Sequence, residues 1–154
     1  MNGRGAARLL LSLLMALWAG AIIGLSFIAT PVKFQAPHLT MPVALEIGRY
    51  TFRLFSNVEL GFLIAIVIAA VFARPRRATI VMLAIVAVQL LLERWWLLPE
   101  LDARVSQILA GGAVTLTSSH WIYAVFDGLK AALLIGCAAS AGRKPGGRSE
   151  ASPC

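Results

Sequence analysis

Charged side chains are scarce in this sequence. Asp, Glu, Lys and Arg make up 14% of the 154 residues, whereas 59% are hydrophobic. A soluble domain has about a quarter of its residues charged. The composition therefore excludes an ordinary soluble globular domain and indicates a membrane protein.

Cysteine and histidine are also rare, at two residues each. Cys137 lies in an apolar segment and Cys154 ends the chain, so neither a redox pair nor a metal-ligand spacing is present. Motifs for a nucleophile elbow, a Walker loop, a dinucleotide fold and a kinase are missing as well. The sequence still allows three classes of function: redox chemistry with a bound cofactor, proton-coupled transport, and lipid or partner binding. It assigns no catalytic residue.

Four long apolar stretches are present, and each approaches the roughly 20 residues that cross a hydrocarbon core. They predict an all-α integral membrane four-helix bundle occupying residues 1–141. The final residues, 142–154, are rich in Gly, Pro and Ser and predict a disordered tail. The predicted spans are about 9–30, 52–73, 78–98 and 121–139.

The net charge of +7 fits membrane topology. The sequence has no basic face interleaved with exposed aromatic residues, so it does not predict nucleic-acid binding. Eight Lys and Arg residues lie on the side of the termini and five on the other, which predicts both termini in the cytoplasm of a bacterial inner membrane. A cleaved signal peptide is the alternative for the first span, but its apolar run is longer than such peptides use.

Ionisable residues interrupt the last span. His120, Tyr123, Asp127 and Lys130 fall on one helical face at about 100° per residue. Charges at this depth are costly, so they point into a bundle, pair with one another or line a wet cavity. A structural ion pair between Asp127 and Lys130 and a functional polar seam are the two interpretations.

Two acidic residues are candidates for the same seam. Glu59 lies just inside the second span, and its predicted partner is on another helix, such as Lys130. Glu93 shares a stripe with Gln89 and Trp96 near the end of the third span. The neighbouring tryptophans indicate the membrane interface, so a headgroup-level charge is the other interpretation of Glu93.

His120 offers a different chemistry. An imidazole at the mouth of the bundle can hydrogen-bond at the interface, exchange protons, or act as an axial ligand of haem. Because His120 has no second histidine or cysteine cluster beside it, the sequence does not predict a multi-ligand metal site.

Three basic residues lie on the side opposite the termini. Arg49, Arg53 and Lys33 suit an interfacial helix that leads into the second span. Alternatively, they reach an anionic partner, either Glu59 or a substrate group.

Small residues also form a stripe. Gly20 and Gly24 make a GxxxG pair in the first span, which allows close helix packing within the chain or homodimerisation. After Pro99, the pattern predicts a short amphipathic helix in the loop between spans three and four, lying on the surface and ending at Gly111 and Gly112.

The segment 18–55 resembles a bacterial four-helix family described as domain of unknown function 4149, which is similar to the eukaryotic transmembrane-protein-205-like proteins. The likeness rests on the glycines of the first span, on Pro31 and Phe34, and on Ala44, Gly48, Arg49 and Phe52, with His120 at the head of the last span. The resemblance implies a membrane protein with a role in tolerance to toxic metals or drugs among the eukaryotic relatives. It implies no catalytic residue.

These observations favour a non-enzymatic multi-pass membrane protein that binds or moves a small solute, metal or proton, or serves stress tolerance. A membrane oxidoreductase using haem or a quinone at His120 is one alternative. A structural or assembly subunit of a membrane complex is another.

Overall fold

The computed structural model describes the backbone of residues 3–112 and 119–142, with side chains for 3–112 and 122–141. The predicted tail, 142–154, lies outside the described residues except for its first residue. Every regular element in the described part is helical. In chain order the elements are α1 (Gly3–Ile22), η1 (Ile23–Ala29), α2 (Thr30–Lys33), α3 (Met41–Ala73), α4 (Arg77–Leu92), η2 (Glu93–Leu97), α5 (Leu98–Leu109) and α6 (Ser119–Gly142).

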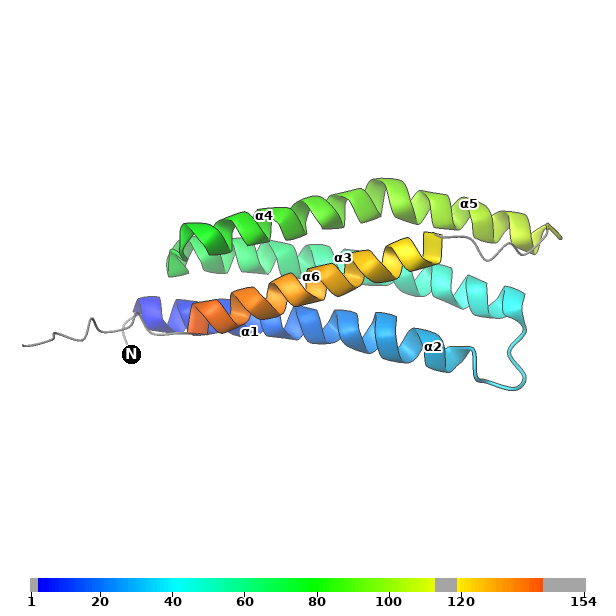
Figure 1. Ribbon diagram of the computed structural model, residues 1–154, viewed down its shortest axis with the longest axis horizontal. Helices are drawn as coiled ribbons and strands as arrows, with labels where there is room; N and C mark the ends of the chain where they lie inside the picture. Colours follow the sequence, from blue (N-terminus) through cyan, green and yellow to red (C-terminus); the bar gives the residue numbers. More distant parts are fainter. Residues whose placement is uncertain (1–2, 113–118, 143–154) are drawn as a thin grey trace, which may run out of the picture.

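These elements form four rods that run side by side (Figure 1). All four are long and apolar enough to cross a membrane, and they comprise Gly3–Lys33, Met41–Ala73, Arg77–Leu109 and Ile122–Ala141. The all-α membrane bundle predicted from the sequence is therefore confirmed. The start of α1, the end of α6 and the connection between α3 and α4 lie at the same end of the bundle, here called the inner end. Which side of a membrane this end faces stays a prediction.

The inner end is closed by direct contacts. Arg8 Nε donates to the carbonyl of Ala73 at 3.5 Å, and Ser12 Oγ donates to the carbonyl of Ala138 at 2.7 Å. Between α3 and α4, Arg74 adopts a left-handed conformation with φ of 46°. Its N–H bonds to Ala70 O at 2.9 Å and so ends α3.

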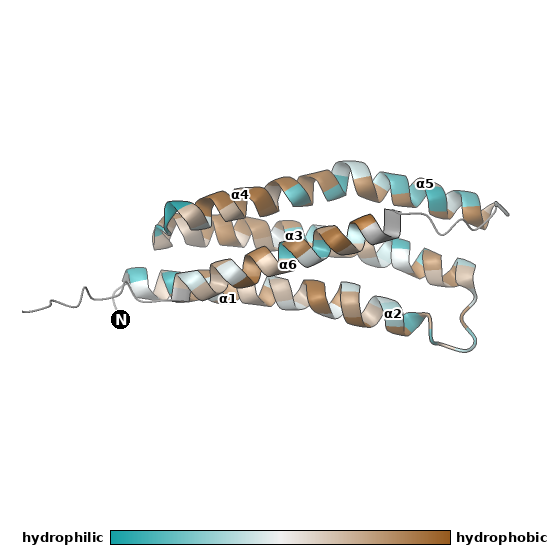
Figure 2. Ribbon diagram, in the orientation of Figure 1, coloured by the Kyte–Doolittle hydropathy of each residue, from teal (hydrophilic) through white to brown (hydrophobic). Residues whose placement is uncertain are grey.

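The core lies along α1, which packs between α3 and α6, while α4 packs on the other side of α6. Buried apolar side chains from all four rods meet there; they include Leu11, Met15, Trp18, Ile66, Val86 and Leu134. Many other large apolar side chains point outward, such as Leu17 and Val71 at 62% and 67% exposed. Figure 2 shows apolar residues over most of each rod and polar ones concentrated on α5 and at the helix ends. Outward apolar surface of this kind suits contact with lipid.

The predicted amphipathic helix is present as α5, but it continues the third span through η2 without a break. Pro99 lies in the first turn of α5, where its missing N–H does not interrupt the helix. The helix ends before Gly111, which has φ of 89°. Rather than lying free on the surface, α5 packs against α3.

The rods α3 and α4–α5 each contain 33 residues. At 1.5 Å per residue each is about 50 Å long, compared with a hydrocarbon core of about 30 Å. Both rods are therefore longer than such a layer is thick. The end of the bundle opposite the inner end is called the outer end.

Gly20 and Gly24 make no close helix contact with the described residues of the chain. A Cβ added at either glycine would meet no atom within 4 Å. The prediction of intramolecular close packing at this pair is therefore wrong, because this face of α1 and η1 points away from the neighbouring rods. Homodimerisation through the pair stays a prediction.

Candidate functional site: a buried lysine held by three carboxylates

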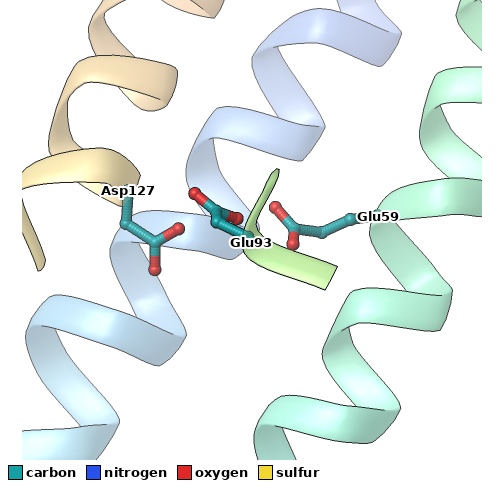
Figure 3. A group of neighbouring side chains, drawn as sticks. All are labelled: Glu59, Glu93 and Asp127. Carbon is teal, nitrogen blue, oxygen red and sulfur yellow. The ribbon is translucent and has the colours of Figure 1, made fainter. Parts of the chain in front are cut away.

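Four ionisable side chains from three different rods meet inside the bundle. Glu59 comes from the middle of α3, Glu93 from the first position of η2, and Asp127 and Lys130 from α6. Figure 3 shows the three carboxyl groups drawn toward the same space between the helices. These four residues are called the acidic centre below.

Lys130 is the hub of the acidic centre. Its Nζ lies 2.8 Å from Glu59 Oε1 and 3.1 Å from Asp127 Oδ1, and it also donates to Glu93 Oε2. The predicted contact between Glu59 and Lys130 is therefore present. All four side chains are shielded, with exposed fractions between 0% and 2%. Glu93 is thus a buried member of this centre, and its depth in a membrane stays a prediction.

Two further side chains hold the carboxylates in place. Trp18 Nε1 donates to Glu59 Oε1 at 3.1 Å, and Ser26 Oγ donates to Asp127 Oδ2 at 2.5 Å. Both come from the first rod, so every rod of the bundle contributes to the centre. Hydrogen bonds to charged groups are stronger than neutral ones, so these two contacts help to fix the carboxylates.

Both π-helical segments lie at this level. Ser26 is inside η1, and Glu93 begins η2. A π segment closes i→i+5 hydrogen bonds and shifts the helical register, and such segments occur often at functional sites. In η2 the shift buries Leu97 and leaves Trp96 61% exposed. The predicted stripe of Gln89, Glu93 and Trp96 is therefore wrong at Trp96, because a regular α-helical spacing was assumed.

The formal charges of the acidic centre do not balance. Three carboxylates face one ammonium group, and in the described part of the chain no second basic side chain lies within 4 Å of these carboxylates. If all four groups were ionised, two negative charges would remain uncompensated in the interior. Such charges are costly at low dielectric. The centre therefore has the capacity to bind protons or a cation.

Hydrogen bonding at the centre is incomplete as well. Glu93 Oε1 and Asp127 Oδ1 are buried and lack a hydrogen-bond partner, and so does Oε1 of Gln89, one turn before Glu93. Gln89 uses its amide nitrogen to donate to the carbonyl of Phe126 at 3.3 Å. Buried oxygens without a donor accept a proton readily, and a protonated carboxyl group can supply the missing donor.

Glu59, Glu93 and Asp127 present ligand oxygens that all lie within 4.8 Å of one another. Carboxylate oxygens of this kind suit a hard cation such as Mg²⁺ or Ca²⁺. Here the ammonium group of Lys130 already contacts all three carboxylates. Lys130 thus serves as a tethered cation, and a metal ion would have to displace it.

The predicted basic candidates lie outside this centre. Arg49 Nε lies 3.1 Å from Asp102 Oδ1, and Arg53 Nε donates to Asp102 Oδ2 at 2.8 Å. Glu59 is therefore not their partner. Lys33 lies near the rings of Phe34 and Phe52, 5.1 and 6.0 Å from the ring centroids.

The remaining seam candidates differ in their surroundings. Tyr123 is buried and packs edge-on against Phe52, with ring centroids 4.8 Å apart. His120 lies in the first turn of α6, but its side chain is outside the described part of the structure. Trp18 and Ser26 were not candidates from the sequence, because an isolated Trp or Ser in an apolar span gives no signal of its partner.

Comparison with known proteins gives one match. No curated protein and no solved structure matches this chain. The family match covers residues 13–108, which include Trp18, Ser26, Glu59 and Glu93 but not Asp127 or Lys130. This range is more than half of the chain, so the protein belongs to the family described as Domain of unknown function (DUF4149).

Proposed function

We propose that this protein is a non-enzymatic, multi-pass membrane protein whose acidic centre takes up and releases protons as the protein binds or moves a small solute. Three carboxylates around a single buried lysine support this proposal. The ratio matters because one ammonium group compensates only one carboxylate. Up to two protons would remove the remaining charge.

Protons fit this arrangement better than a divalent cation does. Lys130 Nζ occupies the space among the oxygens, at 2.8 Å from Glu59 and 3.1 Å from Asp127. A proton can add to Glu93 Oε1, which has no hydrogen-bond partner, while Lys130 keeps its contact with Glu93 Oε2. A metal ion at this position would meet the repulsion of the ammonium group.

Infrared difference spectroscopy tests the proposal directly. The protein in lipid nanodiscs is perfused with buffers of different pH, and the carbonyl stretch of protonated carboxyl groups is recorded. We expect a titrating band that Glu59→Gln, Glu93→Gln or Asp127→Asn diminishes or shifts. Glu100→Gln is the matched control, because Glu100 pairs with Arg104 at 2.8 Å on exposed α5.

Each outcome decides between proton and cation binding. A band that all three centre variants leave unchanged would contradict the proposal. So would carboxylates that stay ionised at every pH while Mg²⁺ or Na⁺ alters their spectrum, and that result would favour a cation site.

We propose further that the chain lies in a bacterial inner membrane with both termini in the cytoplasm. Counted along the sequence, eight Lys and Arg residues flank the spans on the side of the termini and five lie on the other side, which supports this orientation. Reporter fusions at each terminus, one active only in the cytoplasm and one only in the periplasm, test it. A periplasmic signal from either terminus would reverse the assignment.

A further inference from the structure

A second polar feature lies at the outer end of the bundle. A cleft of about 70 Å³ is bounded by α2, α3 and α5. Its walls are mostly apolar and include Phe34, Leu45, Phe52, Leu101 and Val105. Three charged side chains also line it: Lys33 and Arg49 are cationic, and Asp102 is a carboxylate.

Lys33 is the cation without a counter-charge. Among the described residues, no carboxylate lies within 4 Å of its Nζ, which contacts the aromatic faces of Phe34 and Phe52 instead. Gly48 makes room for it, since a Cβ at that position would lie 2.6 Å from Lys33 Nζ. The ammonium group is thus held in a partly buried, largely apolar cleft with donors available.

Arg49 adds to the positive charge at the cleft. Its carboxylate partner, Asp102, is shared with Arg53, so one negative charge serves two guanidinium groups. Arg49 Nε is buried and makes no hydrogen bond, although it lies 3.1 Å from Asp102 Oδ1. The wall of the cleft thus carries two positive charges, on Lys33 and Arg49, and one negative charge, on Asp102, which Arg53 also compensates from outside the wall.

The cleft lies next to the acidic centre. Phe52, in its wall, packs against Tyr123, which is one turn before Asp127 on α6. Thr30, also in the wall, is one turn after Ser26, the hydrogen-bond donor to Asp127. The packed rings of Phe52 and Tyr123 therefore connect the wall of the cleft with the helix that carries Asp127 and Lys130.

We propose that this cleft binds the carboxylate of a small organic monoacid, with Lys33 and Arg49 as its cationic groups and the apolar walls around its short chain. A cleft of about 70 Å³ is several times the roughly 10–15 Å³ of cavity space that a single water needs, so it has room for a carboxylate with a short aliphatic chain. The monoacid is the solute of the proposed function, so this inference rests on that function. Two sources of the same chemistry are a water-soluble short-chain acid and a fatty acid dissolved in the membrane, of which the cleft would hold only the carboxylate end.

Binding of propionate and of laurate to the protein in zwitterionic nanodiscs tests the inference. Empty nanodiscs provide the background for each ligand. We expect Lys33→Gln to weaken binding by about tenfold or more, because a charge-assisted contact is lost. Arg104→Gln is the matched control, since it removes one positive charge from the same end without lining the cleft, and it should leave the affinity within about twofold.

Gly48→Ala gives an independent variant with every charge retained. The added methyl group would displace the flexible end of Lys33, so we expect weaker binding and a folded protein. If propionate binds and Lys33→Gln weakens its binding, the ligand is a water-soluble acid. If only laurate binds in this Lys33-dependent way, the ligand is a fatty acid from the membrane. No binding of either acid, or binding that both variants leave unchanged, would overturn the inference.

The infrared titration separates this failure from that of the proposed function. A titrating carboxyl band in a protein that binds neither acid would overturn the cleft assignment and leave the acidic centre as a proton site. Lys33-dependent binding without a titrating band would support the cleft and contradict the proton-binding proposal.

Discussion

The two charged clusters of this protein are near opposites. In the acidic centre one cation, Lys130, is surrounded by three carboxylates, and all are at most 2% exposed. At the outer end one carboxylate, Asp102, is shared by Arg49 and Arg53, whose side chains are 25% and 51% exposed. Ion-pair distances are similar in both clusters, so distance does not distinguish them. Burial distinguishes them, because water screens the charges of the outer cluster. In the acidic centre, where water is excluded, the charges can be compensated only by one another.

The largest expected effect comes from Lys130→Met. The variant removes the only cation of the acidic centre and leaves three buried carboxylates together, so we expect a loss of about 3–5 kcal/mol in stability. The thermal melting temperature and the monodisperse fraction on gel filtration would measure it.

A combined variant completes this comparison. Adding Glu59→Gln, Glu93→Gln and Asp127→Asn to Lys130→Met removes the uncompensated charge and should restore much of the stability. An unchanged melting temperature in Lys130→Met alone would show that the buried cluster does not depend on its cation.

Ser26→Ala should have the next largest effect. It removes the hydroxyl that donates to Asp127 Oδ2, and the loss of a hydrogen bond to a charged group costs about 1.5–3 kcal/mol. Ser12→Ala is the matched control, because Ser12 donates to the neutral carbonyl of Ala138 at 2.7 Å and should lose only about 1 kcal/mol. Equal losses in the two variants would contradict a charged acceptor at Asp127.

Asp102→Asn should have a smaller effect that depends on salt. It removes the shared carboxylate of Arg49 and Arg53, and a partly exposed pair contributes about 1 kcal/mol or less. Melting curves at low and high ionic strength would measure it, with a smaller difference from the native protein at high salt. A loss as large as that of Lys130→Met would contradict the contrast between the two clusters.

The smallest effect is expected for Arg104→Gln. The pair between Arg104 and Glu100 has side chains 37% and 47% exposed, and an i,i+4 pair of this kind contributes about 0.3–0.5 kcal/mol. The same melting measurement would place this variant within error of the native protein. A clear destabilisation would point to a contact of Arg104 beyond its own helix.

Local sequence signals predicted much of the fold. Hydropathy over about 20 residues identified the four spans. The polar face of the last span predicted Asp127 and Lys130, and the cost of a lone buried charge predicted that Glu59 reaches Lys130. These inferences succeed because each rests on residues close in sequence or on the strong penalty for an unpaired charge.

Other contacts depended on information that the sequence pattern does not carry. The partner of Arg53 is 49 residues away, and its identity follows from how α5 packs on α3. Trp18 and Ser26 contact the centre through the rotation of the first rod, which an isolated polar residue does not reveal. Periodicity also assumed regular α-helical turns, so it placed Trp96 on the stripe of Gln89 and Glu93, where the structure has Leu97.

The two π segments have a mechanical consequence. Each segment lies within a continuous rod and divides it into an inner and an outer part. The faces of the outer part are therefore rotated about the helix axis from where an uninterrupted α-helix would place them. Conversion of a π turn to an α turn changes the register by about one residue, which rotates one part relative to the other by roughly 100°. Ser26 and Glu93 lie at these joints, so a rotation of the outer part of either rod would change which side chain faces Lys130.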